Sequence, residues 1–211
     1  MYQRALQEYK KARGLDYILT LNTVNNLGNL YKSLGRLNEA EKMYQRALQE
    51  KEMAWGLDYI LTLDTVNNLG NLYVDLGRLD EAEKMHQRAL QGYEKALGPE
   101  NIQTFLPALR AMWGLAFLSS RQDRVEDARS LYLTALSGYQ KVVGDHHPSC
   151  QALRDNLAAL GREGNKTSAA TYRESMQTRS QPQTIVDPGA GHKLQTSRRH
   201  KILERLSLKR T

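Results

Sequence analysis

The chain has 211 residues, of which 40% are hydrophobic and 7% aromatic; this suits either one ordinary domain or a helical repeat array. Its net charge of +7 is confined to one end, because residues 1–161 carry 19 basic and 19 acidic side chains whereas residues 162–211 carry 11 and 4. A single cysteine excludes an internal disulfide, and neither a signal-like apolar start nor a run of about 18 apolar residues is present. We therefore expect a cytoplasmic protein without a transmembrane segment.

Two stretches of 42 residues stand in tandem. Residues 1–42 and 43–84 align without a gap and differ at only eight positions. The phrase Thr-Val-Asn-Asn-Leu-Gly-Asn-Leu-Tyr occupies residues 23–31 and again residues 65–73, and a weaker copy follows later. A fixed period of this length predicts stacked repeats of one supersecondary unit, because a single unit of this size cannot bury its apolar face alone.

Each unit contains two amphipathic helical patterns. The first has apolar residues at spacings of three and four, in the second unit Leu69, Leu72, Tyr73 and Leu76. The second pattern follows with Ala82, Met85, Ala89, Leu90 and Tyr93. Gly77 is expected to end the first helix, and the spacing of Asp80 and Glu83 predicts an N-cap at the start of the second. The sequence thus predicts a helix, a tight turn and a second helix in every unit.

The third unit departs from the repeat. Residues 109–117 replace the asparagine-rich phrase, and Ala128 follows Ala82 by 46 residues. We therefore expect four extra residues between about Met112 and Arg124, with a longer turn at residues 119–123. Trp113 is then either an apolar anchor in a groove or a residue buried beneath that turn. His86, at the place of Tyr44, is expected to be a partly buried stacking residue.

The patterns predict an all-α repeat domain over residues 1–161. Its units are placed at about residues 1–42, 43–84, 85–130 and 131–161, and the units at both ends are incomplete. Array ends without a polar capping helix leave an apolar face uncovered. Either the chain is a piece of a longer protein, or the ends are covered by self-association or by the tail.

Residues 162–211 form a basic low-complexity tail. They contain too few apolar residues to offset the entropy of ordering, so we expect disorder. The last part, residues 198–210, has the pattern of a short basic amphipathic helix. Such a tail could attract nucleic acid, an anionic membrane or a nuclear import receptor, or remain a solvated segment. No specific nucleic-acid binding is expected.

A polar stripe runs beside the apolar one on the first helices. In the first unit it consists of Asn22, Asn25, Asn26 and Asn29, and in the second unit of Asp64, Asn67, Asn68 and Asn71. Asparagine is a poor helix former, so this density needs a reason. A primary amide offers both a donor and an acceptor to the main chain of an extended peptide. Alternatively, Asn26 and Asn68 bond neighbouring helices, while Asn22, Asn25 and Asn67 are only solvated.

Several residues resemble the signature of a tetratricopeptide repeat, namely Gly70, Tyr73, Gly77, Ala82 and Ala89. The 42-residue period and the linker over residues 144–148 resemble the kinesin light chain subgroup, and the resemblance covers residues 1 to about 160. It implies a right-handed α–α superhelix, a tetratricopeptide solenoid whose first helices line a concave peptide-binding groove.

The resemblance also implies which residues contact a peptide. Four amides match the contacting positions, namely Asn26, Asn29, Asn68 and Asn71. Asn156, and in ungapped register Arg110, fall at the place of Asn26 and Asn68. An arginine among amides would favour a peptide carboxylate or an acidic side chain.

We therefore expect a non-enzymatic scaffold that binds protein or peptide segments and needs no cofactor. The alternative is a regulatory or sensor array from a larger multidomain signalling ATPase of the NB-ARC or STAND-like kind. No catalytic, cofactor or metal residue is predicted. His146 and His147 are adjacent rather than four apart, and residues 161–167 lack the glycine directly before lysine that a phosphate loop needs.

Overall fold

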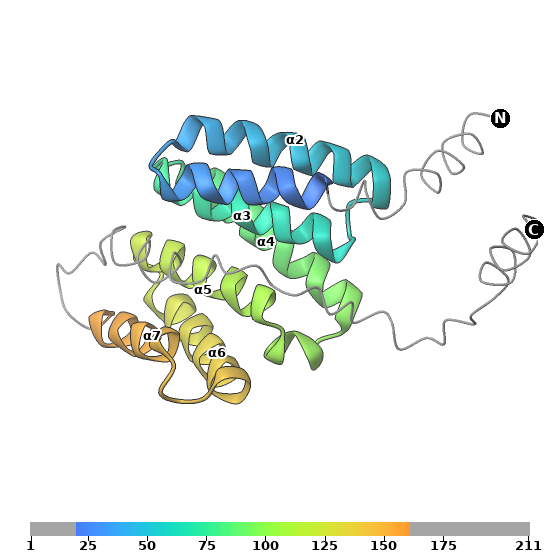
Figure 1. Ribbon diagram of the computed structural model, residues 1–211. Coiled ribbons are helices and arrows are strands. Elements are labelled where there is room, and N and C mark those ends of the chain that lie inside the picture. The colour runs from blue at the N-terminus through green and yellow to red at the C-terminus, as the bar shows by residue number, and fades with distance from the viewer. Residues whose placement is uncertain (1–19, 161–211) are drawn as a thin grey trace, which may run out of the picture. The chain divides into compact units, whose positions relative to one another are not determined.

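The computed structural model describes residues 20–160, which form helices joined by short connections (Figure 1). A helix at residues 20–33, blue in Figure 1, comes first. It is followed by α2 (Leu37–Trp55), α3 (Ile60–Asp75), α4 (Leu79–Leu97), the 3-10 helix η1 (Asn101–Thr104), α5 (Leu106–Arg121), α6 (Val125–Val143) and α7 (Pro148–Ala159). The described residues contain no strand, and the predicted all-α solenoid of helix pairs is confirmed.

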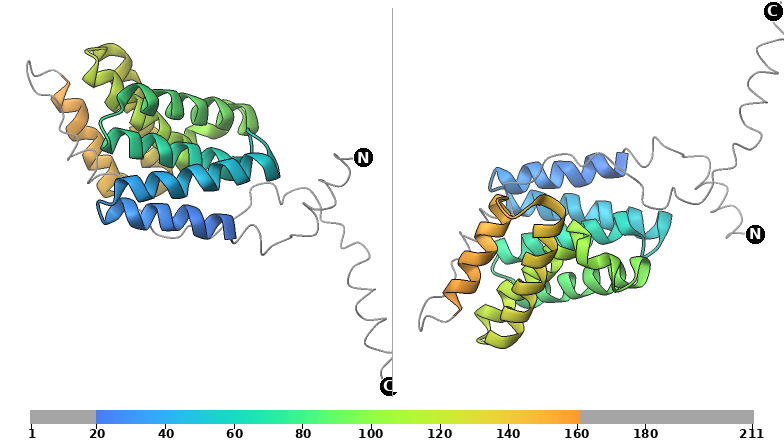
Figure 2. Two further views of the ribbon diagram at one scale, coloured as in Figure 1. Left: turned by 90° about the horizontal axis from the view of Figure 1, so that it is seen from above. Right: turned by 90° about the horizontal axis from the view of Figure 1, so that it is seen from below.

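The helices alternate between two layers (Figure 2). We call the helix at residues 20–33 together with α3, α5 and α7 the first-helix layer, and α2, α4 and α6 the second-helix layer. From α2 onward each α-helix packs on the next one in the chain, and within the first-helix layer α3 also contacts α5 directly. A helix such as α4 is therefore sandwiched between α3 and α5. The stacking of neighbouring pairs, rather than any single pair, encloses the core.

Small and aromatic residues alternate on the buried side of the second-helix layer. Each member of this set is at most 1% exposed: Ala40, Tyr44, Ala47, Ala82, His86, Ala89, Ala128, Tyr132 and Ala135. The alanines let backbones approach, and the rings fill the space between successive first helices. This pattern confirms the apolar stripe predicted for the second helices.

His86 is enclosed more tightly than the sequence predicted. Its side chain is 0% exposed, whereas its position in the repeat suggested partial burial. A Cβ added to Gly70 would lie 2.7 Å from the ring carbon Cε1, and one added to Gly114 would lie 2.5 Å from Nε2. Because α3 and α5 reach the ring from two sides, only glycine fits at either position.

Gly114→Ala is therefore expected to destabilise the array. The added methyl group would meet a buried ring that cannot move away, and overpacking of this kind costs roughly 1–3 kcal/mol. Urea unfolding of the single variant should show this loss. In a background of His86→Ala the same substitution should cost much less, because the ring is gone. An equal cost in both backgrounds would contradict this packing.

The extra residues of the third unit lie elsewhere than predicted. The turn from α5 to α6 spans residues 122–124 and the turn from α3 to α4 spans residues 76–78, so both have the same length. The insertion is in the connection before α5, at residues 98–105, which contains η1. Ile102 anchors this longer connection in the core, and Phe105 stacks edge-on against the ring of Tyr93 at 5.3 Å.

The predicted N-cap at Asp80 is also wrong. Helix α4 starts at Leu79, and the N-cap position is held by Arg78, whose side chain makes no cap bond. Instead, the Arg78 guanidinium lies 4.3 Å from the centre of the Tyr73 ring and pairs with Glu41 of α2 at 2.7 Å. It also pairs with Glu81. The turn residue thus ties two successive units together.

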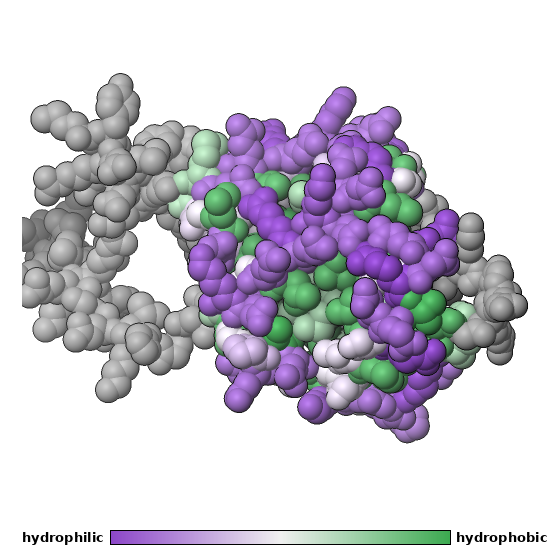
Figure 3. Space-filling view, turned by 180° about the vertical axis from the view of Figure 1, so that it is seen from behind, coloured by the Kyte–Doolittle hydropathy of each residue, from purple (hydrophilic) through white to green (hydrophobic). Residues whose placement is uncertain are grey.

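The face of the described residues that Figure 3 shows is mainly hydrophilic, with smaller hydrophobic areas. Two leucines of the first unit stand out: Leu30, on the helix at residues 20–33, is 52% exposed, and Leu34, in the turn after it, is 61% exposed. Leu72, the repeat equivalent of Leu30, is 0% exposed. The residues before position 20 and the predicted disordered tail lie outside the described part of the chain. Self-association through the array ends therefore stays a prediction. Within the described residues, no helix is long and apolar enough to cross a membrane.

Candidate functional site

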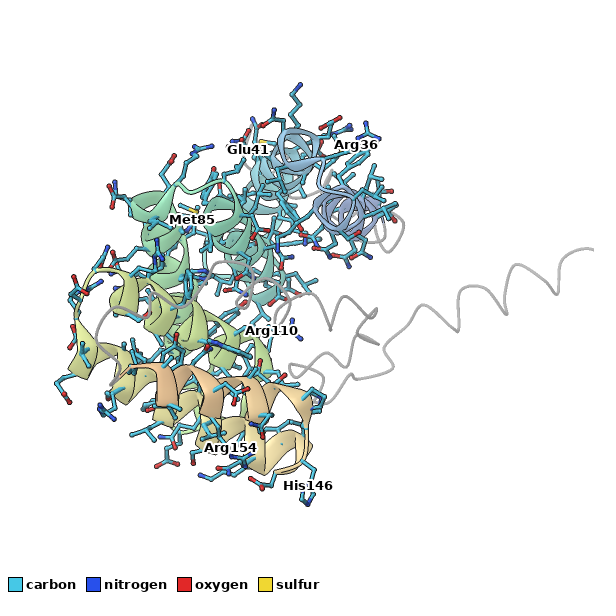
Figure 4. The ribbon with its side chains drawn as sticks, turned by 90° about the vertical axis from the view of Figure 1, so that its left-hand side faces the viewer. Arg36, Glu41, Met85, Arg110, His146 and Arg154 are labelled. Atoms are coloured by element: carbon cyan, nitrogen blue, oxygen red, sulfur yellow. The ribbon has the colours of Figure 1, made fainter. Side chains whose placement is uncertain are left out.

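The polar stripe lies on the first-helix layer, and the residues predicted to bind a ligand differ in exposure. They comprise Asn26, which is exposed; Asn29, Asn68 and Arg110, which are partly buried; Asn71, which is 9% exposed; and Asn156, which is 2% exposed. Arg110 lies near the middle of the array (Figure 4), between Glu41 at one end and Arg154 at the other. The first four residues offer surface to a ligand, whereas Asn71 and Asn156 offer little.

The amide of Asn29 is held from the second-helix layer. The hydroxyl of Tyr44 on α2 donates to Asn29 Oδ1 at 2.5 Å. Burial raises the pKa of the Tyr44 hydroxyl, so it remains a donor at neutral pH. A Cβ on Gly28 would lie 2.7 Å from this ring, which shows how closely the two helices meet. With its oxygen engaged, Asn29 directs its NH2 group elsewhere.

A buried hydrogen-bond network joins the first two units. Asn25 Oδ1 accepts from Thr65 Oγ1 at 3.1 Å and from Asn68 Nδ2 at 3.3 Å. The amine of Lys51, which is only 2% exposed, donates to Thr65 Oγ1 at 2.9 Å and to the Leu61 carbonyl at 3.0 Å. Asn25 is therefore a structural link between helices, and its predicted role as a solvated residue is wrong. Burial lowers the pKa of Lys51 to about 8.

Asn67 is likewise buried rather than solvated. It is 3% exposed, and its Oδ1 lies 2.9 Å from Nδ1 of His86 on α4. Burial, helped by the nearby positive charge of Lys32, lowers the pKa of His86 to about 3. The imidazole is therefore neutral at physiological pH, and it can donate its Nδ1 hydrogen to the amide oxygen.

Asp64 lies among donors and cations. Its Oδ1 accepts from the hydroxyl of Tyr93 at 2.6 Å, and the positive charges of Lys51 and Arg110 are close enough to act on it. Burial nevertheless outweighs these favourable contacts and raises the pKa of the Asp64 carboxyl. Arg110 itself makes no hydrogen bond or ion pair with any described residue.

The position of Arg110 in the repeat differs from the predicted one. Because the insertion precedes α5, helices α3 and α5 start 46 residues apart, at Ile60 and Leu106. Arg110 therefore takes the place of Asp64, and Gly114 takes the place of Asn68. The ungapped register is wrong, but it still identified an arginine on the first-helix layer.

Charged groups on and beneath the first-helix layer occur where the two near-identical units differ. Four of the eight differing positions carry them: Lys32 faces Asp75 in an ion pair of 3.2 Å, Lys51 replaces Tyr9, and Asp64 replaces Asn22. The side chain of Asp75 is 3% exposed, so its pairing with Lys32 offsets the cost of burying it. Sequence divergence between the copies was the signal that could have identified these residues.

The contact between the third and fourth units lacks the amide acceptor that joins the first two units. Trp113 takes the place of Asn25, and Asn156 takes the place of Asn68. The indole N–H of Trp113 therefore stands where the first unit has the amide oxygen of Asn25, which accepts from Asn68. Trp113 Nε1 and Asn156 Nδ2 are both buried without a partner among the described residues. Trp113 is 1% exposed and packs edge-on against Tyr139 at 5.9 Å. It is therefore a core residue and not a groove anchor.

Tyr132 repeats the place of Tyr44 but not its hydrogen bond. Phe117 stands where Asn29 stands in the first unit, so no amide oxygen faces the Tyr132 hydroxyl. This hydroxyl is buried without a partner among the described residues, although Ser120 lies near it. The amide stripe is thus continuous over two units, whereas in the third unit its places are taken by Arg110, Trp113, Gly114 and Phe117.

The described residues hold no group of three or more histidine, cysteine, aspartate or glutamate side chains that could bind a metal ion. Their polar groups instead form a row of amide, carboxylate and guanidinium side chains along adjacent helices. These side chains can form hydrogen bonds and ion pairs with a ligand.

Stacked helix pairs with glycine, tyrosine and alanine at these places define the tetratricopeptide class of repeat proteins. Tetratricopeptide repeat models match residues 1–49, 62–103 and 109–149, which is more than half of the chain. The chain belongs to the tetratricopeptide repeat family. No curated protein sequence gives a significant match.

A solved structure of similar fold is the crystal structure of BtubC (BKLC) from P. vanneervenii. It is 21% identical with a TM-score of 0.61; the likeness covers 84% of this chain and 66% of that one. The present chain thus spans less than two thirds of that protein. At this level of identity the likeness shows a shared fold.

Proposed function

We propose that the chain is a non-enzymatic scaffold whose first-helix layer binds an extended peptide segment of a partner protein. The family as a whole supports a role in protein interaction, and family members are generally not catalysts. The observation that carries the finer proposal is Arg110. A partly buried guanidinium that makes no hydrogen bond or close ion pair with the described residues has five donors available, and a carboxylate is their best complement.

The neighbours of Arg110 favour an acidic group on the ligand. Lys51 and Arg110 contribute two positive charges beside the single carboxylate of Asp64, whose oxygen already accepts from Tyr93. An acidic side chain or a chain terminus of the ligand would therefore enter a region with excess positive charge. The exposed amide of Asn26, on the helix at residues 20–33 beyond α3, would contact the peptide main chain.

A double substitution tests this proposal. Asn26→Ala with Arg110→Ala should weaken the binding of a peptide selected by phage display on the full chain by roughly tenfold or more, since it removes one charge-assisted and one neutral hydrogen bond. Neither side chain has a hydrogen bond within the described residues, and the lost attraction between Arg110 and Asp64 is a minor one, so the melting temperature should fall only slightly. Fluorescence anisotropy with the labelled peptide gives the affinity.

A matched control is available on the second-helix layer. Asn38→Ala with Arg46→Ala makes the same chemical changes at exposed positions of α2. This variant should bind as the wild type does. If both double variants bind equally well, the first-helix layer is not the binding surface. If the first one loses helical content together with binding, Asn26 and Arg110 are structural residues and not ligand contacts. No observation on residues 20–160 favours the alternative of a sensor array from a larger ATPase.

A further inference from the structure

The amides of the first-helix layer are not equivalent, because side chains beneath them engage different atoms. At Asn29 the carbonyl oxygen accepts from Tyr44, which leaves the NH2 group without a partner among the described residues. At Asn68 the NH2 group donates to Asn25, which leaves the carbonyl oxygen without a partner in the same range. Both residues are partly exposed, so these remaining groups are within reach of a ligand.

Each of these orientations is itself held in place. The donor to Asn29 is the hydroxyl of Tyr44, which is 1% exposed, so its hydrogen has no solvent acceptor that could replace Asn29 Oδ1. The acceptor for Asn68 is Asn25 Oδ1, which also receives the hydroxyl of Thr65. Thr65 in turn accepts from the buried amine of Lys51. Turning the Asn29 amide by half a rotation would leave the buried hydroxyl hydrogen of Tyr44 without this acceptor, and turning the Asn68 amide would place two amide oxygens face to face.

We infer that the two amides present fixed and opposite polarity to a peptide: Asn29 donates to a main-chain carbonyl, and Asn68 accepts from a main-chain N–H. Tyr44 and Asn25 act as positioning residues for them. This inference rests on the proposed function and makes it more specific. An amide that offered both groups equally would accept either part of the peptide bond, whereas the fixed orientations select one part at each position.

Editing of the peptide backbone tests the inference. The probe is the display-selected peptide of the preceding section, made with one peptide bond at a time converted to a thioamide or N-methylated. A thioamide weakens the acceptor and keeps the donor, while N-methylation removes the donor. The position that meets Asn29 should lose affinity by roughly threefold to tenfold as a thioamide, in keeping with one hydrogen bond. The position that meets Asn68 should lose affinity on N-methylation.

Two single variants assign these effects to residues. In Asn29→Ala the sensitive thioamide position should bind no worse than the unmodified peptide, and in Asn68→Ala the same should hold for the sensitive N-methyl position. The opposite assignment, in which Asn29→Ala removes an N-methyl effect, would overturn the inference. Equal thioamide and N-methyl effects at both residues would overturn it as well. If Asn26→Ala with Arg110→Ala leaves binding unchanged, the proposed function itself fails.

Two matched variants test whether Tyr44 positions the amide of Asn29. Tyr44→Phe removes the hydroxyl that holds Asn29, and Tyr132→Phe makes the same change at the equivalent place, where the hydroxyl has no partner among the described residues. Tyr44→Phe should reduce the thioamide effect at the Asn29 position, whereas Tyr132→Phe should leave it intact. Measured well below the melting transition, this difference does not follow from a loss of stability. The same thioamide effect in both variants would show that Tyr44 does not orient Asn29.

Discussion

Acidification from pH 6.5 towards pH 3 should lower the free energy of unfolding by up to about 5 kcal/mol through His86 alone. Burial first, and then the charge of Lys32, lowers its pKa from 6.5 to about 3 in the folded protein. In the unfolded chain the imidazole takes up a proton near its ordinary pKa. The stability is therefore complete above pH 6.5 and is lost as the pH falls towards the folded pKa.

The physical reason is that the folded protein has no room for a charged imidazole. Glycine residues 70 and 114 bring backbone against the ring from two sides, and Nε2 has no partner among the described residues. A second proton would be buried there without an acceptor. Carboxylates in ion pairs also respond to acid, so the test compares slopes rather than absolute stabilities.

Urea unfolding at a series of pH values measures this effect. His86→Gln should reduce the slope of unfolding free energy against pH below pH 6.5, since glutamine does not titrate. His146→Gln, at an exposed position, should retain the slope of the wild type. If His86→Gln and the wild type lose stability in parallel, His86 is not the source of acid sensitivity.

Raising the pH from about 8 to about 10.5 should stabilise the protein by about 3 kcal/mol through Lys51. Burial lowers its pKa from 10.5 to about 8, and the attraction of Asp64 only partly opposes this shift. Below pH 8 the amine is charged in both states, and the fold bears the cost of burying that charge. Above pH 8 the amine of the folded protein loses its proton, and the cost of burying the charge disappears. The amine of the unfolded chain keeps its proton until about pH 10.5, so the free energy of unfolding rises between these two pKa values.

The Lys51→Met variant should not show this rise. Burial raises the pKa of Tyr44, Tyr93 and Tyr132, so ionisation of tyrosines in the unfolded chain opposes the lysine effect near pH 10. The informative quantity is therefore the difference between wild type and variant from about pH 8 to about pH 9.5. Lys95→Met, at an exposed position, should behave as the wild type does. A difference that does not change with pH would contradict the burial of a titrating amine.

The sequence predicted the fold well because repetition and spacing determine it. A 42-residue repeat with leucine, glycine and tyrosine at helical spacing predicts a pair of amphipathic helices in each unit, and such pairs must stack to bury their apolar faces. The third unit was harder to place because residues 109–117 lack the repeated phrase, so the register depended on Ala128 alone. An insertion in the preceding connection and one in the turn give the same separation of 46 residues.

The polar stripe was predicted, but the role of each amide was not. Asn25 and Asn26 are neighbours in the sequence and both match the repeat, yet one is buried and the other exposed. Which of them meets the next helix depends on how that helix is rotated, and a single amphipathic pattern does not fix this rotation. Lys51 was missed for a related reason, because a buried amine looks like any other surface lysine in the sequence.

Binding of an extended peptide to the first-helix layer is tested most directly by nuclear magnetic resonance. The full chain, labelled on asparagine side-chain amides and arginine guanidinium groups, would be titrated with the display-selected peptide. Shifts should appear at Asn26, Asn29, Asn68 and Arg110 and be absent at Asn38 and Arg46 of the second-helix layer. Shifts confined to α2, α4 and α6, with Arg110 unaffected, would contradict the account.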